Sequence, residues 1–370
     1  MPHTFLEIDL KKLASNFRLV QKIVGAGVKV AAVVKSNAYG HGLLRIAEYL
    51  APLADYLAVD NFEEALILRE EGLDLPILIL GPVEKERFKA ALNYNVEFVL
   101  FDAADIEPLA RLASEINKKA ILHLKVDTGL SRLGFLPEEV LDIVRHINEF
   151  SYLKLEGIYS HFIDSAANLV LTSKQLRAFQ NLLALLQREN LRPPLVHLAN
   201  SGGVLNCPAS YFDMVRVGGL LYGLEPGSGL LPRMAEMGFQ PVLSWKSQVA
   251  ALKNVRAGSL VGYGGSFKAK KPSLIAVIPV GYADGFDRGF SNHGFALVGN
   301  VKCPVVGRVC MRMSMLDVSA APEVKKGDEV VLLGEQGGEK ITATDLAGFI
   351  GTNSYEITTR LIEGLPRVYK

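Results

Sequence analysis

The chain has 370 residues, of which 49% are hydrophobic and 21% are charged, and its formal net charge is +1. This composition predicts a large packed core and excludes extended disorder. The near-neutral charge argues against general nucleic-acid binding. Three cysteines without metal-ligand spacing predict neither a disulfide framework nor a metal site, so we expect a reducing, cytoplasmic location. No signal peptide is expected at the N-terminus, and no apolar run approaches the roughly 20 residues of a membrane span.

The first two thirds of the chain alternate between apolar runs and amphipathic segments. Residues 5–10 predict a short strand, and Asp9 or a neighbour is expected to start a helix over 11–23. Eight further strands are expected at 28–34, 56–59, 76–80, 96–100, 121–126, 153–159, 195–198 and 214–217, with helices between most of them. This alternation predicts a (β/α)8 TIM barrel, which we place at residues 11–228. An open doubly wound sheet is the alternative, and the lack of Gly-x-Gly-x-x-Gly after the first strand weakens it.

A change in composition follows the predicted barrel. Pro226, Gly227 and Gly229 mark a linker, and the chain beyond them is rich in strands and poor in helices. Strands are expected at 243–254, 273–280, 296–298, 305–309, 314–318 and 329–333, and a helix at 344–350. We therefore predict a mainly-β C-terminal domain at residues 229–370, with which the strand in residues 1–10 is free to pair.

Polar residues follow the predicted barrel strands at the ends where barrel enzymes carry their sites. We interpret Asp60 and Asn61 as caps or strand-end groups. The remaining residues describe a polar, partly cationic site: Lys35, Asp127, Thr128, Ser160, His161, Asn200, Ser201, Arg216 and Gly218.

Lys35 stands at the end of the first predicted barrel strand, and Tyr39 and His41 follow closely. A lysine there is costly to bury unless it is paired or used covalently. Its amine suits a Schiff base with an aldehyde, and pyridoxal 5'-phosphate is the obvious aldehyde cofactor. A snorkelling lysine is one alternative, and a class I aldolase lysine is another. For His41 we expect a structural hydrogen bond.

The segments after the last two barrel strands are rich in glycine and small polar residues. Asn200-Ser201-Gly202-Gly203 and Arg216-Val217-Gly218-Gly219 stand where barrels bind phosphate. Tyr39 is expected to add a hydroxyl to the same phosphate.

Arg216 offers only hydrogen-bond donors. If it faces the pyridine nitrogen of the cofactor, that nitrogen stays unprotonated, which favours quick reprotonation of a carbanion over decarboxylation or transamination. A structural pairing of Arg216 with Asp213 is the alternative.

Racemisation needs two acid–base groups on opposite faces of one carbon. Lys35 suits one face. Tyr263 stands in Val261-Gly262-Tyr263-Gly264-Gly265-Ser266, a glycine-rich loop that permits close approach to another group. As a base on the second face, Tyr263 would need His161 and Arg216 as a supporting relay. From the residues alone, an ordinary loop aromatic is the commoner interpretation of Tyr263.

Specific motifs extend this pattern over nearly the whole chain. They include Ala31-Ala32-Val33-Val34-Lys35-Ser36-Asn37-Ala38-Tyr39-Gly40-His41-Gly42, Lys125-Val126-Asp127-Thr128-Gly129, Tyr159-Ser160-His161-Phe162, His197-Leu198-Ala199-Asn200-Ser201, Pro279-Val280-Gly281-Tyr282-Ala283-Asp284-Gly285, Gly307-Arg308-Val309-Cys310-Met311 and Asn353-Ser354-Tyr355-Glu356. With these motifs the chain closely resembles the alanine racemases, which are fold-type III pyridoxal-phosphate enzymes.

The resemblance implies that Lys35 holds the cofactor and acts on D-alanine, while Tyr263 acts on L-alanine. It also implies that Arg132 and Met311 contact the amino-acid substrate. The product D-alanine would serve peptidoglycan synthesis.

The resemblance further implies that Tyr355 and Tyr39 contact the cofactor phosphate. Lys125 matches a lysine that is often carbamylated and holds the arginine at Arg132. A homodimer with shared active sites is implied, in which the other chain supplies Tyr263 and Met311.

Several positions depart from the family pattern. Arg312 and Met313 replace the usual Asp-Gln, Gly219 replaces an isoleucine, and Asn353-Ser354 replaces Ile-Asn. Arg312 either attracts an acidic side chain or pairs with a nearby aspartate, Asp284 or Asp317. A racemase for serine or for larger or charged amino acids is therefore an alternative. A fold-type III decarboxylase is a further alternative, which Tyr263 disfavours. A non-catalytic cofactor-binding protein is another, which the β domain disfavours.

Overall fold

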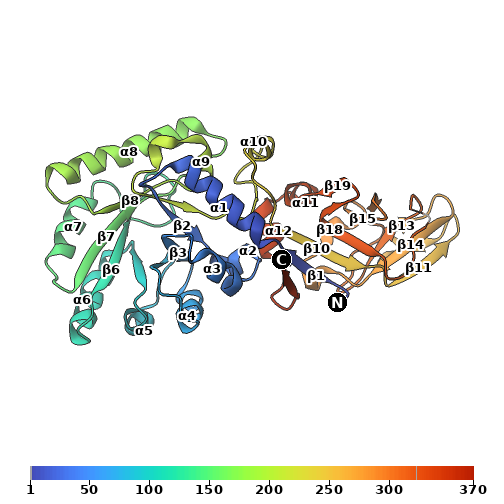
Figure 1. Cartoon of the computed structure of the whole chain (residues 1–370), viewed down its shortest axis with the longest axis horizontal. Helices are drawn as coiled ribbons and strands as arrows, with labels where there is room; N and C mark the ends of the chain where they lie inside the picture. Colours follow the sequence, from blue (N-terminus) through green and yellow to red (C-terminus); the bar gives the residue numbers. More distant parts are fainter. Residues whose placement is uncertain (1, 322) are drawn as a thin grey trace.

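The computed structural model describes residues 2–321 and 323–370 and contains a closed barrel of eight parallel strands. The strands are β2 (Lys29–Val33), β3 (Tyr56–Val59), β4 (Ile77–Ile79), β5 (Glu97–Leu100), β6 (Ala120–Lys125), β7 (Leu153–Tyr159), β8 (Leu195–His197) and β9 (Met214–Val217). β9 pairs in parallel with β2 and closes the ring. The prediction of a TIM barrel is confirmed, and Figure 1 shows the barrel on the left of the molecule.

Helices surround the barrel because each one presents an apolar stripe to the strands. They are α1 (Leu10–Val24), α3 (Leu43–Leu50), α4 (Phe62–Glu70), α5 (Phe88–Asn93), α6 (Ile106–Glu115), α7 (Val140–Asn148) and α8 (Leu169–Arg188). The carboxylate of Asp9 caps α1 by accepting a hydrogen bond from the Lys12 amide. Leu13 and Phe17 on α1 are fully buried, as the helical spacing predicted.

The C-terminal domain is mainly β and lies on the right of Figure 1. Its larger sheet has the order β16-β15-β18-β10-β1-β20, with β19 paired to β18. These strands are β16 (Val301–Pro304), β15 (Phe295–Val298), β18 (Glu329–Gln336), β10 (Leu243–Gln248), β1 (Phe5–Ile8), β20 (Arg367–Tyr369) and β19 (Glu339–Ile341). A second sheet joins β11 (Ala251–Val255), β14 (Ser273–Ile278) and β17 (Ser314–Asp317), and a small ribbon joins β12 (Leu260–Val261) and β13 (Phe267–Lys268).

The first strand of the chain belongs to the sheet of the C-terminal domain. β1 pairs antiparallel with β10 and parallel with β20, so the domain contains both ends of the described chain. Figure 1 shows both termini close to the junction of the two parts. The boundary that we place at residues 228–229 stays a prediction.

Two strand predictions in the C-terminal domain are wrong. The expected strand at 243–254 is two strands in different sheets, because Val249 bonds to Asp328 at the end of the first sheet while Ala250 bonds to Val277 of the second. The expected strand at 305–309 is irregular and makes only an isolated bridge at Val305. Its valines are buried, so the hydrophobic pattern reported burial and not strand geometry.

A left-handed turn follows β2. Ser36, Asn37, Ala38 and Tyr39 all have φ between 52° and 54°, although a left-handed conformation costs an L-residue roughly 1–2 kcal/mol. The buried imidazole of His41 stabilises this turn, since its Nδ1 lies 3.0 Å from the carbonyl oxygens of both Ala38 and Tyr39. This contact matches the structural hydrogen bond expected of His41.

Candidate active site

A cavity of about 460 Å³ opens at the carboxyl ends of the barrel strands. Its walls contain most of the site residues that the sequence placed on the barrel, together with one residue of the C-terminal domain. These are Lys35, Tyr39, Lys125, Arg132, His161, Asn200, Ser201, Arg216, Gly218, Gly219 and Tyr355. Asp127, Thr128 and Ser160 do not line it. The tertiary structure therefore brings residues that span 320 positions of the sequence into one pocket.

Lys35 leaves the end of β2 and points its amine at a carboxylate. Its Nζ lies 2.8 Å from Oδ1 of Asp60, which follows β3. Asp60 is therefore a paired strand-end group, as one of its two interpretations expected, and Asn61 caps α4 by accepting from the Glu64 amide. Lys35 thus has an ionic partner among the residues that line the pocket.

Two tyrosines and two glycines form one side of the pocket. A Cβ added to Gly218 would lie 2.4 Å from the Tyr39 hydroxyl, and one added to Gly219 would lie 2.3 Å from the Tyr355 hydroxyl. Only glycine permits this close approach. Burial, aided by the charge of Asp60, raises the pKa of Tyr39 to about 12, and burial also raises the pKa of Tyr355. Both phenols therefore stay neutral donors, suited to an anionic group.

Asn200 and Ser201 organise the loop beside these phenols. Oδ1 of Asn200 accepts from the Gly203 amide at 2.9 Å and caps the short helix α9 (Ser201–Asn206). Oγ of Ser201 accepts from the Gly218 amide at 3.3 Å and so ties the loop after β8 to the loop after β9. The side-chain oxygen of Asn200 is thus used within the loop, and its side-chain NH2 group is the part that can bind a ligand.

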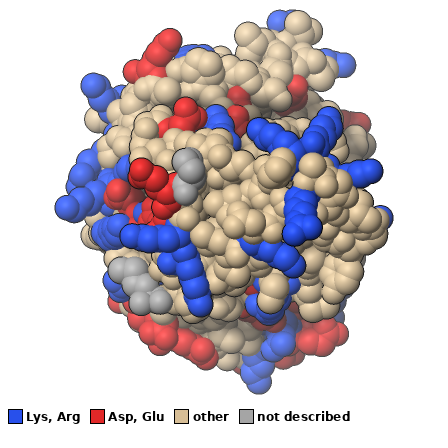
Figure 2. Space-filling view, turned by 90° about the vertical axis from the view of Figure 1, so that its right-hand side faces the viewer, with Lys and Arg blue, Asp and Glu red and all other residues tan. Residues whose placement is uncertain are grey.

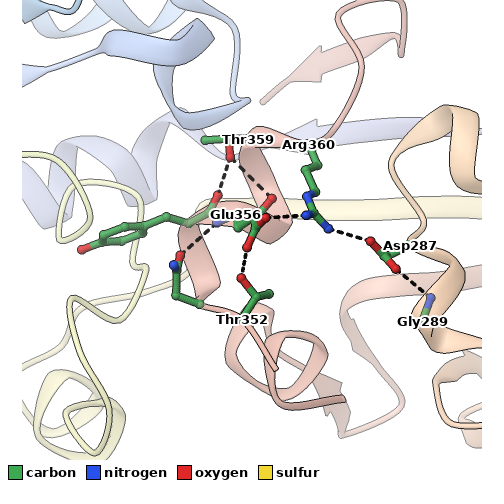
Figure 3. A network of polar contacts seen from close by, with 8 residues as sticks. Asp287, Gly289, Thr352, Glu356, Thr359 and Arg360 are labelled. Carbon is green, nitrogen blue, oxygen red and sulfur yellow. Dashed lines mark hydrogen bonds and ion pairs between the residues drawn. The ribbon is translucent and has the colours of Figure 1, made fainter. Parts of the chain in front are cut away.

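Tyr355 is held by the short helix α12 (Ser354–Thr359), which sequence reasoning missed. Asn353 caps this helix by accepting from the Glu356 amide at 3.1 Å. Figure 3 shows Arg360 between Glu356 and Asp287, and Glu356 in turn contacts Thr352. Because Asp287 belongs to a distant loop and accepts from Arg360 at 2.6 Å, this network fixes α12, and with it Tyr355, against the C-terminal domain.

Arg216 is fully enclosed and makes contacts with several groups. Its guanidinium lies 2.8 Å from Nδ1 of His197, 2.8 Å from the carbonyl oxygen of Ser160 and 3.3 Å from Nδ1 of His161. It also stacks on the Tyr159 ring. Among the described residues no salt bridge includes Arg216, and Asp213 pairs with Arg192 instead, so the alternative pairing is wrong. Burial lowers the pKa of Arg216 to about 10, so it remains a cation.

Lys125 lies in a cluster of cations. Burial is the main cause that lowers the pKa of Lys125 to about 7, and the nearby charges of Arg216 and Arg132 act in the same direction. Its Nζ lies 4.6 Å from the centroid of the Tyr159 ring. The pKa of His161 is also far below its usual range, because of burial and then Arg216. At neutral pH His161 is therefore an uncharged imidazole, and Lys125 loses its proton far more readily than an ordinary lysine.

Tyr263 and Met311 do not reach this pocket within one chain. Both line a separate, open hollow on the C-terminal domain, where their side chains are 72% and 59% exposed. Arg312 lies in the same hollow and donates to Asp284 at 2.8 Å. The end of the molecule formed by this domain carries basic side chains around a broad uncharged area, with acidic side chains along another edge (Figure 2).

Sequence reasoning missed three neighbours of the candidate residues: Asp60 beside Lys35, and His197 and Tyr159 beside Arg216. A signal for the last two was present, because alternate residues of a barrel strand point inward. His197 stands two residues after Leu195 on β8, and Tyr159 ends β7. Across the described chain no helix has the length and apolar character needed to cross a membrane. In residues 2–321 and 323–370 no group of three or more His, Cys, Asp or Glu residues is arranged to hold a metal ion.

The fold and the pocket together define a class of protein. A lysine at the end of the first barrel strand, two neutral phenols over paired glycines and a buried arginine make this a TIM-barrel enzyme suited to a phosphorylated aldehyde cofactor.

Comparison with known proteins identifies the family. The model for the alanine racemase N-terminal domain matches residues 8–226, and that for the C-terminal domain matches residues 242–369. The chain is 39% identical to the alanine racemase of Halothermothrix orenii over 369 residues, covering 99% of this chain and 97% of that protein. It is 40% identical to that of Syntrophobacter fumaroxidans over 359 residues, covering 96% and 95%.

Solved structures agree with this assignment. The alanine racemase of Clostridium difficile superposes with a TM-score of 0.94 at 30% identity, covering 100% of this chain and 96% of that one. The alanine racemase of Bacillus anthracis, solved with bound L-Ala-P, gives a TM-score of 0.93 at 32% identity, covering 100% and 95%. The chain belongs to the alanine racemase family. This family uses pyridoxal 5'-phosphate, and the lysine, the phenols and the glycine cradle of the pocket fit that cofactor.

Proposed function

We propose that this protein interconverts L- and D-alanine by a two-base mechanism with pyridoxal 5'-phosphate. We further propose that it acts in the cytoplasm and that its D-alanine is used for peptidoglycan synthesis. The observation that carries the proposal is the single pocket that collects Lys35, Arg216, Tyr39 and Tyr355 in a chain matched over almost its whole length by alanine racemases. All three cysteines are free, which agrees with a reducing compartment.

Each pocket residue has a proposed role. Lys35 holds the cofactor aldehyde and, once released, exchanges a proton with one face of the substrate α-carbon. Tyr39 and Tyr355 donate to the phosphate, and Arg216 keeps a permanent cation beside the ring. When bound, the cofactor accepts the electron pair that the α-carbon releases. Arg132 binds the substrate carboxylate at the rim of the pocket.

The second base requires a second copy of the chain. Tyr263 and Met311 are exposed in a hollow away from Lys35, so the pocket of one chain holds only one of the two proposed bases. We propose a homodimer in which the partner's C-terminal domain brings Tyr263 and Met311 to the pocket. There Tyr263 exchanges the proton on the opposite face of the α-carbon, and His161 with Arg216 supports it.

The contact of Arg312 favours alanine over acidic substrates. Arg312 would attract an acidic side chain if its guanidinium were free, but Asp284 already accepts from it at 2.8 Å. Because Asp284 is buried and Arg312 is partly exposed, the aspartate fixes the direction of the arginine. We therefore expect no activity with aspartate or glutamate.

The test uses purified protein, each amino acid in turn, D2O and chiral chromatography. Rapid inversion of alanine with deuterium uptake at the α-carbon is expected. Rapid exchange with another amino acid, without exchange of alanine, would reject the substrate. If Lys35→Ala still bound the cofactor covalently, the role of Lys35 would be wrong.

Mixed dimers test the shared site. Lys35→Ala and Tyr263→Phe are each expected to be inactive. After random exchange of subunits, half of the dimers would be mixed, with one intact site each, so we expect recovery to about a quarter of wild-type activity. A mixture that stays inactive after proven subunit exchange would show that the two residues do not act across a dimer.

A further inference from the structure

A row of hydrogen bonds crosses the interior of the barrel behind the active site. One guanidinium nitrogen of Arg216 lies 2.8 Å from Nδ1 of His197. Nε2 of His197 lies 2.9 Å from Nδ1 of His123, and Nε2 of His123 lies 2.7 Å from Oε2 of Glu97. These four residues, here called the interior row, stand on β9, β8, β6 and β5. Both imidazoles are fully buried.

The chemistry of the two end groups sets the direction of every hydrogen bond in the interior row. Arg216 can only donate, so Nδ1 of His197 must accept and carry no proton. A neutral His197 then has its proton on Nε2 and donates to Nδ1 of His123. His123 in turn has its proton on Nε2 and donates to the carboxylate of Glu97. Burial, together with the charge of Arg216, lowers the pKa of His197, which agrees with a neutral ring.

The opposite arrangement brings two donors together. If His123 carried its proton on Nδ1, or on both nitrogens, Nε2 of His197 would have to accept. The proton of a neutral His197 would then lie on Nδ1, facing an N–H of Arg216 at 2.8 Å. Such a contact is repulsive and would displace the guanidinium. The tautomers of His123 and His197 that suit Arg216 therefore require a hydrogen-bond acceptor beside Nε2 of His123. Glu97 is that acceptor.

The barrel wall is built to hold His123 in this place. A Cβ added to Gly157 on β7 would lie 2.3 Å from Nδ1 of His123, so glycine leaves the room for the ring. The pairing of β6 with β7 shifts register between Leu122 and His123, an irregularity that redirects side chains. The ring of Tyr159 stacks on His197 at 4.8 Å and nearly parallel.

Glu97 is placed to accept a hydrogen bond from His123. Its side chain is 12% exposed, and the pair with His123 is its one salt bridge in the described residues. Tyr56 also approaches Glu97: burial, then the charge of Glu97, raises the pKa of Tyr56. A neutral phenol beside the carboxylate supplies a second donor and stabilises its charge.

We propose that Glu97 is a positioning residue for Arg216. It selects one tautomer of His123 and of His197, and these hold the guanidinium in the orientation that the cofactor ring requires. The inference rests on the proposed racemase function for its catalytic consequence, whereas the tautomers follow from the contacts of the interior row alone.

The first experiment measures the tautomers directly in the wild-type protein. The chain has seven histidines, so 15N-labelled histidine gives a tractable spectrum. Long-range 15N–1H correlations distinguish a ring protonated on Nε2 from one protonated on Nδ1 or on both. We expect His123 and His197, assigned by single His→Gln variants, to be neutral and protonated on Nε2. A proton on Nδ1 of either ring overturns the proposal, whether or not the protein racemises alanine.

The second experiment changes the acceptor. Glu97→Gln keeps an oxygen for His123 and is expected to retain both tautomers and kcat within about twofold. Glu97→Ala removes the acceptor and is expected to change the tautomers and to lower kcat roughly tenfold, the scale typical of groups that orient a ligand from behind, with little change in KM for alanine. Glu156→Gln is the matched control, because Glu156 lies near Tyr56 but pairs with Lys154.

The outcomes separate the two proposals. The positioning role is overturned if Glu97→Ala leaves both kcat and the tautomers unchanged, or if only one of them changes. Should Glu97→Ala fail to fold, Glu97→Gln and the wild-type spectrum still decide the tautomers. A wild-type protein without racemase activity would contradict the proposed function. The tautomers of His123 and His197 could still be measured in that protein.

Discussion

The guanidinium of Arg312 donates a hydrogen bond to the carboxylate of Asp284 over 2.8 Å, and the two side chains differ greatly in exposure, at 64% and 5%. Asp284 also accepts from the Gly281 amide at 2.9 Å. The pairing with Asp284 neutralises the charge of Arg312, as one of the two interpretations of Arg312 expected.

Substitutions at this pair are expected to differ in cost. Arg312→Gln should lower the free energy of unfolding by less than about 1 kcal/mol, because the arginine is largely solvated. Asp284→Ala should cost about 1–3 kcal/mol, since it leaves the buried Gly281 amide without its acceptor. Urea unfolding measures both values. Equal costs for the two variants would contradict this account.

Lys125 is expected to make stability depend on pH. Its pKa falls from 10.5 to about 7 in the folded chain. Between these values the unfolded chain binds a proton that the folded chain lacks, so the free energy of unfolding rises with pH over this range. In buffer freed of carbon dioxide, Lys125→Met should remove this contribution and be relatively more stable at pH 7 and below. The exposed Lys174→Met serves as the control, and an identical pH dependence in both variants would refute the assignment.

An uncharged Lys125 is also a nucleophile for carbon dioxide. Attack of Nζ on the carbon forms a carbamate with loss of one proton, and the new negative charge would lie near Arg132 and Arg216. With 13C-bicarbonate we expect a carbamate carbonyl signal that Lys125→Met lacks. A spectrum without this signal would exclude the modification, and Lys125 would then act as an amine.

The glycine cradle is expected to control cofactor affinity. Gly219→Ala would place its Cβ 2.3 Å from the Tyr355 hydroxyl and displace the ring. Loss of one hydrogen bond to a charged group costs about 1.5–3 kcal/mol, so the Kd for pyridoxal phosphate should rise roughly 10- to 100-fold. Gly348→Ala, with open space around its Cβ, is the control. If Gly219→Ala binds the cofactor like wild type, the proposed cradle is wrong.

Arg360 should influence the cofactor site through α12. Arg360→Ala removes the link between Glu356 and Asp287 (Figure 3) and loosens the helix that carries Tyr355. We expect a several-fold rise in the dissociation rate of pyridoxal phosphate, with a loss of stability of about 1 kcal/mol or less. Arg145→Ala breaks a comparably exposed pair with Glu189 and should change stability alone. Equal dissociation rates in the two variants would show that α12 does not depend on Arg360.

The barrel could be predicted from the sequence because its strands are buried on both faces. The run of β3 is apolar and fully buried, and the bounds of both β3 and β7 match those expected in a chain of alternating strands and helices. In the C-terminal domain the same reasoning failed at Val305 and Val249, because apolar residues there pack beneath irregular chain or at a crossing between two sheets. Hydrophobicity reports burial, and only pairing decides which buried segment is a strand.

By itself, the sequence determined the barrel class and the residue types of the site, since strand ends of a parallel barrel must meet at one rim. Only the tertiary structure decided which groups touch. The pairing of Lys35 with Asp60 joins two strand ends, and the left-handed turn of Ser36–Tyr39 opposes the preference of each of its residues. The interior row from Arg216 to Glu97 depends on four strands closing around one axis. Such contacts depend on closure and register, which are properties of the whole barrel and not of any local run of residues.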